Sequence, residues 1–81
     1  MTVKLIDSTT IALAGNCTVE DADHLLQHLL ANPGAEIDWR ECDRMHASVL
    51  QVLLAAKTRI KGVPRGQFLQ DWIAPLLPTG Q

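Results

Sequence analysis

Two histidines, His24 and His28, lie four residues apart in the segment DADHLLQHLL. On a helix this spacing places both rings on one face, where two imidazoles can bind a zinc ion. Asp21, Asp23 and Gln27 are the only nearby side chains that offer a third ligand. The helical wheel places both histidines opposite a stripe of leucines, facing water. We therefore interpret them as solvated side chains and predict no metal site.

A cysteine and a histidine, Cys42 and His46, also lie four residues apart. A thiol next to an imidazole is the arrangement of many cysteine nucleophiles. No glycine-rich anion-binding turn and no orienting side chain accompanies the pair, so we interpret Cys42 as a packing residue. The chain is predicted to have no catalytic residues, no enzymatic activity and no cofactor.

The composition is that of a small folded domain. The chain has 81 residues, 47% of them hydrophobic and 20% charged, and a net charge of -2. This size predicts one domain spanning residues 1–81, and the slightly acidic balance argues against binding to nucleic acid. The apolar runs are too short to insert in a membrane, and the first ten residues lack the pattern of a signal peptide. Cys17 and Cys42 have no metal or redox spacing and fit reduced thiols, so we expect a cytoplasmic protein.

Alternation and helical periodicity predict the elements that position these residues. Residues 2–7 and 10–15 alternate between apolar and polar, which predicts a hairpin whose second strand ends at Gly15. A helix then starts at Thr18 with Asp21 in the capping-box position and stops at the segment NPG. Its predicted apolar face contains Val19, Ala22, Leu25, Leu26, Leu29 and Leu30.

The second half of the chain predicts a third strand over residues 35–42 and a helix over residues 46–61. We expect a short final helix that packs the aromatic side chains of the tail over the sheet edge, and residues 66–69 are the candidate for a fourth strand. The order is β-β-α-β-α-(β)-α, with strands two and three parallel. This predicts an α/β fold with a mixed sheet of three to four strands and helices packed on it.

The predicted second helix has an unusual outer face. Ala47, Ser48, Gln51, Ala55 and Thr58 fall on the side turned away from its apolar stripe. These side chains are small or uncharged, whereas solvated helix faces usually carry long charged residues. Such a face lets another protein approach closely without burying a charge. Either a partner or the chain's own tail covers it, and we favour a partner.

The order of elements, with the segment IDWRECDRMHASVLQVLLAAKTR at its centre, resembles the STAS domain of the anti-sigma-factor-antagonist family. The family's motif, Asp-Ser-(Ser, Ala or Thr)-Gly-(Leu or Ile), begins the helix after the third strand, and a partner kinase phosphorylates its first serine in regulatory members. The resemblance covers about residues 2–62. It puts the family's aspartate on His46, the phosphorylated serine on Ala47 and the next small residue on Ser48. Asp38 matches an acidic position near the end of the family's third strand.

The resemblance implies a non-enzymatic protein–protein interaction module of a bacterial regulatory or signalling system. Its partner would be a regulatory kinase, an anti-sigma-type protein or another signalling protein, and a homodimer is possible. The predicted partner-binding residues are Asp38, His46, Ala47, Ser48, Gln51 and Ala55. Since Ala47 has no hydroxyl group, the usual phosphorylation switch is absent, and Ser48 is the alternative acceptor.

Two other functions stay open at this point. A STAS-like chain can be a permanently bound subunit of a larger assembly, such as a bacterial lipid-transport complex. Phosphoryl transfer through His46 is disfavoured, because the positive end of the helix dipole opposes a protonated imidazole there.

Overall fold

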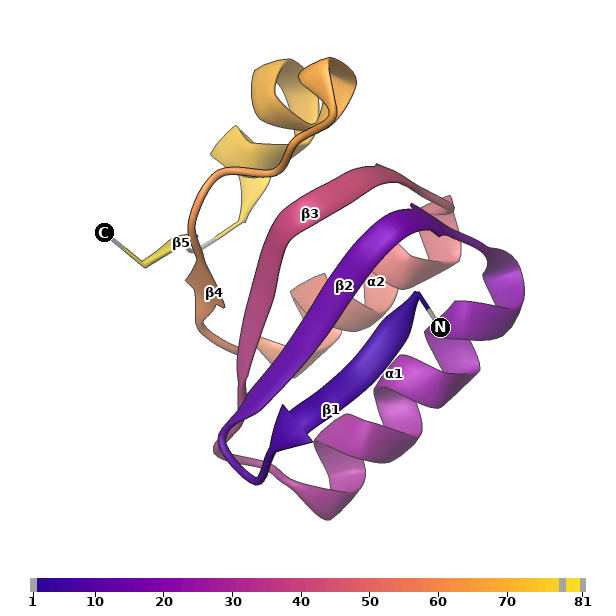
Figure 1. The fold of residues 1–81 in the computed structure, drawn as a ribbon, viewed down its shortest axis with the longest axis vertical. Helices are drawn as coiled ribbons and strands as arrows, with labels where there is room; N and C mark the ends of the chain where they lie inside the picture. The colour runs from indigo at the N-terminus through magenta and orange to yellow at the C-terminus, as the bar shows by residue number, and fades with distance from the viewer. Residues whose placement is uncertain (1, 78, 81) are drawn as a thin grey trace.

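A mixed β-sheet with two helices on one of its faces forms the fold (Figure 1). The computed structural model describes residues 2–77 and the backbone of residues 79 and 80, so residues 1, 78 and 81 of the predicted domain lie outside the described part. In chain order the elements are β1 (Val3–Asp7), β2 (Thr10–Cys17), α1 (Val19–Ala31), β3 (Glu36–Met45), α2 (Ala47–Ala56), β4 (Ile60–Lys61), the π-helical turn η1 (Leu69–Ile73), the 3-10 turn η2 (Ala74–Leu76) and β5 (Thr79–Gly80).

The strands are ordered β1-β2-β3-β4-β5 across the sheet. β1 and β2 form the predicted antiparallel hairpin, whereas β2, β3, β4 and β5 run parallel to their neighbours. The predicted α/β class, with a mixed sheet and helices packed on it, is confirmed. Four strands make up the body of the sheet, and the two-residue β5 lies at its edge.

Strand register explains which side chains reach the core. One row across the sheet joins Leu5, Ile11, Ile37 and Ile60, and the last three of these are fully buried against the helices. The next row joins Lys4, Ala12, Asp38 and Lys61 on the opposite face. Because side chains alternate along a strand, one face of the sheet is apolar and the other carries charge.

The beginning of α1 follows the predicted capping pattern. The Asp21 carboxylate accepts hydrogen bonds from the backbone N–H of Thr18, at 2.7 Å, and from its hydroxyl, at 3.2 Å. β2 does not end at Gly15, as predicted, but continues to Cys17. Gly15 adopts a φ of 67° beside a register shift, a left-handed conformation that suits glycine.

The predicted helix over residues 46–61 is wrong at its C-terminal end. α2 stops at Ala56, because Lys57 adopts a left-handed conformation with a φ of 52°. Thr58 was expected on the exposed face but is buried, and its hydroxyl donates a 2.6 Å hydrogen bond to the carbonyl oxygen of Ala35. Ile60 continues the apolar helical spacing in the sequence, yet it is buried as part of β4 next to β3.

The C-terminal segment also departs from the prediction. Residues 66–69 form no strand, and η1 and η2 lie beyond the upper end of the sheet in Figure 1. Its aromatic side chains, Phe68 and Trp72, do not cover the sheet edge: they are 65% and 67% exposed. Leu69 and Leu77 are the buried anchors instead.

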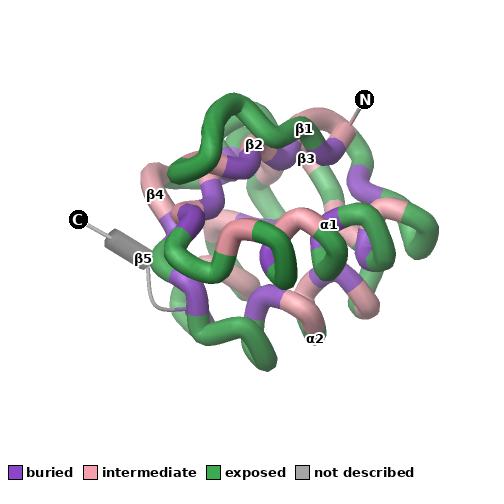
Figure 2. Tube along the Cα trace, turned by 90° about the horizontal axis from the view of Figure 1, so that it is seen from below, coloured by how far each residue is buried: buried purple, intermediate pink, exposed green. Residues whose placement is uncertain are grey.

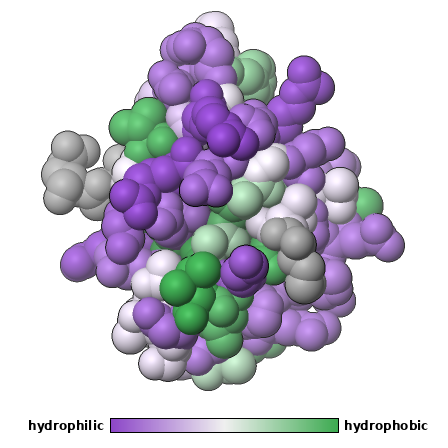
Figure 3. All heavy atoms as spheres, viewed as in Figure 1, coloured by the Kyte–Doolittle hydropathy of each residue, from purple (hydrophilic) through white to green (hydrophobic). Residues whose placement is uncertain are grey.

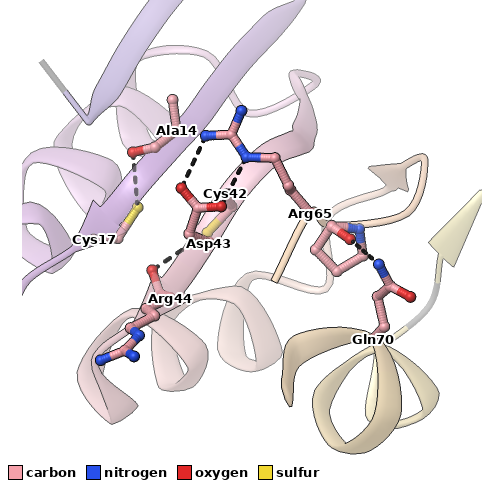
Figure 4. Close-up of polar contacts among 8 residues, drawn as sticks. Ala14, Cys17, Cys42, Asp43, Arg44, Arg65 and Gln70 are labelled. Atoms are coloured by element: carbon pink, nitrogen blue, oxygen red, sulfur yellow. Dashed lines mark hydrogen bonds and ion pairs between the residues drawn. The ribbon is translucent and has the colours of Figure 1, made fainter. Parts of the chain in front are cut away.

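A cluster of polar contacts holds the start of this segment on β3 (Figure 4). The guanidinium of Arg65 contacts the carboxylate of Asp43 through two hydrogen bonds of 2.7 and 2.8 Å, which lower the pKa of Asp43 below its ordinary value. The backbone N–H groups of Arg65 and Gly66 both donate to the carbonyl oxygen of Cys42, at 3.0 Å. Gln70 donates to the carbonyl oxygen of Pro64 at 2.9 Å.

The core lies between the apolar face of the sheet and the two helices (Figure 2). Trp39 is its largest fully buried side chain, and its indole N–H donates a 2.8 Å hydrogen bond to the carbonyl oxygen of Gly62. Among the described residues, no helix has both the length and the apolar character needed to cross a membrane.

Candidate docking surface

A groove of about 700 Å³ lies between α1 and α2. Both helices follow strands that run in the same direction, so they lie side by side under the sheet and are nearly parallel (Figure 2). Side chains from both helices and from the loops that follow them form its walls. They are Val19, Ala22, Asp23, Leu26, Leu29, Leu30, Pro33, Ser48, Gln51, Val52, Ala55, Ala56 and Thr58.

The α1 wall is apolar and exposed. Val19, Leu26 and Leu30 were predicted to be core residues, but they are 57%, 42% and 73% exposed. The predicted apolar face of α1 is wider than the part of the helix that the sheet covers, so these side chains are left on the flank that faces α2. Leucines at this level of exposure, lining a groove, are typical of a surface that binds another protein.

The α2 wall contains most of the predicted strip. Ser48, Gln51 and Ala55 line the groove, and Gln51 and Ala55 are exposed. Ala47 is exposed in the first turn, so the C-terminal segment does not cover the strip. None of the ten residues of α2 is charged, and a partner can therefore contact this wall without removing water from an ionised group.

His46 is the N-cap of α2, in an extended conformation with a φ of -67° and a ψ of 151°. Its Nδ1 accepts a 3.0 Å hydrogen bond from the backbone N–H of Ser48 and lies 2.8 Å from the Ser48 hydroxyl oxygen. Asp43, three residues before this cap, pairs with Arg65 instead of capping the helix.

Replacing His46 by alanine should lower the free energy of unfolding by about 1 kcal/mol, because the Ser48 N–H loses its side-chain acceptor. Urea denaturation followed by circular dichroism measures the change. The control is His46→Asn, whose side-chain oxygen can accept the same hydrogen bond and should retain most of the stability. Equal losses in the two variants would contradict the capping role.

Asp38 is not part of this surface. It lies on the face of the sheet that the helices leave open, where it forms a bidentate ion pair with Arg40 at 3.0 and 2.8 Å. The hydrogen bonds from Arg40 lower the pKa of Asp38. Figure 3 shows this open face, which is mostly hydrophilic with a hydrophobic area over β1. The predicted grouping of Asp38 with the α2 residues is therefore wrong: the sheet separates them.

The two cysteines are packed inside the fold. Cys17 and Cys42 are both fully buried and reduced, and Figure 4 shows them on neighbouring strands. A hydrogen bond with Cys17, together with burial, raises the pKa of the Cys42 thiol well above its ordinary value. A thiol held in the protonated form is a poor nucleophile, so this geometry does not favour chemistry at Cys42.

We expect both thiols to react with a thiol reagent only as fast as the chain unfolds, because the reagent cannot reach them in the folded state. The measurement is the rate of colour release from a disulfide reagent, with the urea-unfolded chain as the reference for full reactivity. Labelling of the folded chain at the rate of a free cysteine peptide would contradict this burial.

His24 is exposed and His28 is partly buried on α1. In the part of the chain that the structure describes, no three His, Cys, Asp or Glu side chains come together in a group able to hold a metal ion. The two rings thus have no third ligand nearby.

No protein-family model matches this chain, and searches of curated proteins and of solved structures find no match either. The resemblance to STAS domains therefore stays a prediction.

The sequence predicted one wall of the groove and missed the other. Ser48, Gln51 and Ala55 were identified from their uncharged character, and the structure brings them together. Val19 and Leu30 were missed because their helical spacing is that of core residues. The signal that could have identified them is the width of the apolar face of α1, which exceeds what one side of a helix buries against a sheet.

Proposed function

We propose that this chain is a cytoplasmic, STAS-like protein–protein interaction module of a bacterial regulatory or signalling system, with no enzymatic activity of its own. It docks through the start of α2 and the groove between α1 and α2. The observation that carries the proposal is the uncharged α2 wall facing the exposed leucines of α1 across an open groove.

The chemistry of the groove fits a protein partner. A groove between two helices with an apolar lining accepts the apolar face of a partner helix or loop. Asp23 is the one charged side chain in the lining, at the end where α1 begins. A partner therefore buries mostly apolar surface and meets polar groups at the rim, as in other protein interfaces.

The proposed module is not regulated by the usual serine switch, because Ala47 occupies the position of the serine that is phosphorylated in STAS domains. Ser48 is the alternative acceptor, and its hydroxyl is only partly exposed and hydrogen-bonded to His46. Incubation with a cognate kinase followed by intact-mass measurement tests this point. A phosphate on Ser48 would show that the module is switched after all.

The exposed leucines favour a second candidate function, a permanently bound subunit of a larger assembly such as a lipid-transport complex. Leu30 alone is 73% exposed, and obligate interfaces are more apolar than transient ones. The rate at which a captured partner dissociates separates the two candidates: a regulatory interaction module exchanges its partner with added competitor, whereas a permanently bound subunit does not.

The test of docking compares capture of a partner from native lysate by the wild-type chain and by Gln51→Arg. The arginine places a long charged side chain in the groove, while a substitution at an exposed site should change stability by only about 0.5 kcal/mol or less. The matched control is His24→Arg, an exposed α1 position about 120° around the helix from Leu30 and outside the groove lining.

We expect the wild-type chain and His24→Arg to capture the same partner, and Gln51→Arg to lose it. Binding of the purified partner should then show the same order of affinities. If Gln51→Arg binds as tightly as the wild-type chain, the groove is not the docking surface.

A further inference from the structure

The C-terminal segment presents a second exposed apolar surface, which we call the C-terminal ridge: Phe68, Trp72 and Leu76. These side chains follow one another at intervals of four residues and are 65%, 67% and 62% exposed. Two of the three aromatic residues of the chain are thus in water rather than in the core. Tryptophan and phenylalanine are enriched at protein interfaces, where they fill pockets on the partner.

The ridge is held in place, which favours binding. Leu69 and Leu77 are buried beneath it, and the Arg65–Asp43 ion pair fixes its start on β3. A side chain presented from an anchored segment loses less conformational freedom on binding than one on a mobile tail. The exposure of the ridge is therefore a stable property of its surface.

The ridge is short enough to lie along the groove. It covers nine residues, Phe68 to Leu76, over the turns η1 and η2, and the α1 wall covers twelve, Val19 to Leu30, about 16 Å at the α-helical rise. Bulky side chains four residues apart are the usual anchors of a helical segment that binds in a groove between helices. The groove, at about 700 Å³, has room for large side chains.

The charges around the two surfaces are also complementary. Lys57 and Arg59 are exposed next to Pro33 and Ala56, at the end of the groove where α2 stops. Glu36 lines the same hollow, so two basic groups and one acidic group lie at this end. The ridge carries Asp71 directly before Trp72; this residue is exposed, and its carboxylate accepts a 2.9 Å hydrogen bond from Gln67. The excess of positive charge at the groove end attracts Asp71 and favours one direction of binding.

We propose that the groove between α1 and α2 of one copy binds the C-terminal ridge of a second copy of this chain. This inference rests on the proposed function. It uses the same docking surface and names the molecule that occupies the groove when no other partner is bound. Trp72 and Phe68 of one copy lie between Leu26 and Leu30 on one side and the α2 wall on the other, with Asp71 toward Lys57. A signalling partner would have to displace this ridge to bind.

The test measures the mass of the full chain by light scattering and its self-association constant by sedimentation. The wild-type chain should associate at micromolar concentrations. Trp72→Asp removes the central anchor from the ridge, and Gln51→Arg obstructs the groove. Each should weaken association by about 30-fold or more, the effect of losing an interface hot spot.

Mixing the two weakened variants gives the sharpest result. Gln51→Arg keeps an intact ridge and Trp72→Asp keeps an intact groove, so a one-to-one mixture should form a heterodimer although neither variant associates by itself. Thermal unfolding of each variant establishes that it folds, since both substituted side chains are exposed.

The control is Ile6→Asp, at a 55% exposed apolar position on the edge strand β1. Ile6→Asp should associate as the wild-type chain does. Loss of association in Ile6→Asp but not in Trp72→Asp would place the contact at the β1 edge and overturn the proposal.

A wild-type chain that stays monomeric up to about 1 mM would also overturn it, and so would a mixture of the two weakened variants with no heterodimer. Either result would exclude a second copy as the occupant of the groove but would not contradict the proposed docking function. Capture of a different partner, lost in Gln51→Arg and kept in His24→Arg, would still support the proposed docking function.

Discussion

Replacing Trp39 by alanine is expected to lower the free energy of unfolding by about 3–5 kcal/mol, the usual cost of removing a large aromatic side chain from a core. Trp39 is 0% exposed, and it is the largest of the fully buried side chains. It lies on β3, the central strand, so a cavity at this position affects the packing of both neighbouring strands and the helices. The loss is a large share of the stability of a small domain.

Trp39 also makes a polar contact that alanine cannot replace. Its indole N–H donates a 2.8 Å hydrogen bond to the carbonyl oxygen of Gly62, just after β4. Without this donor, the turn between β4 and the C-terminal segment loses its link to the core. Loss of this hydrogen bond, about 1 kcal/mol for a partly buried pair, is part of the expected change.

Trp39→Phe separates the two contributions. Phenylalanine keeps most of the buried ring and loses the N–H donor, so we expect a smaller loss than for alanine. Circular dichroism in urea measures both variants, because substitution of Trp39 changes the fluorescence signal itself. A loss below about 1 kcal/mol for Trp39→Ala would contradict the central position of this side chain in the core.

Gly66→Ala should be the second most damaging substitution, with an expected loss of about 3 kcal/mol. A Cβ atom at position 66 would lie 1.9 Å from the carbonyl oxygen of Asp43, a backbone atom that cannot rotate away. The loop must therefore move off β3. That movement breaks the two N–H bonds to the carbonyl oxygen of Cys42 and strains the Arg65–Asp43 ion pair.

The matched control is Gly34→Ala, in the loop between α1 and β3. A Cβ atom at this position meets no heavy atom within 4 Å, and the backbone is not left-handed. It should be neutral or slightly stabilising, because alanine restricts the unfolded chain. Similar results for the two variants would mean that the close approach of Gly66 to β3 is absent in solution.

Gly66→Ala also bears on the function of the C-terminal ridge. Phe68 and Trp72 are unchanged in this variant, so their exposure alone predicts no change in self-association. If the ridge binds a second copy because it is anchored, releasing its start should weaken self-association. Sedimentation of this variant measures the effect on the same scale as Trp72→Asp.

The sequence by itself determined the elements whose signals are local. The hairpin, α1 with its Thr18 cap and the parallel pairing of β2 with β3 follow from alternation, capping residues and the helical connection between the strands. Each of these signals depends on neighbours within a few residues, and the structure confirms them. The uncharged α2 strip was predicted for the same reason, since the sequence alone shows that the side chains of Gln51 and Ala55 are uncharged.

Only the tertiary structure decided where α2 ends and which apolar residues stay in water. Ile60 suits a helix face and a two-residue strand equally well by spacing, and its place beside β3 depends on a pairing 23 residues away along the chain. Leu30 and Trp72 have the spacing of core residues, yet they are 73% and 67% exposed. Periodicity shows which side chains can share a face, but burial also requires a second element opposite that face, and its position is a property of the whole fold.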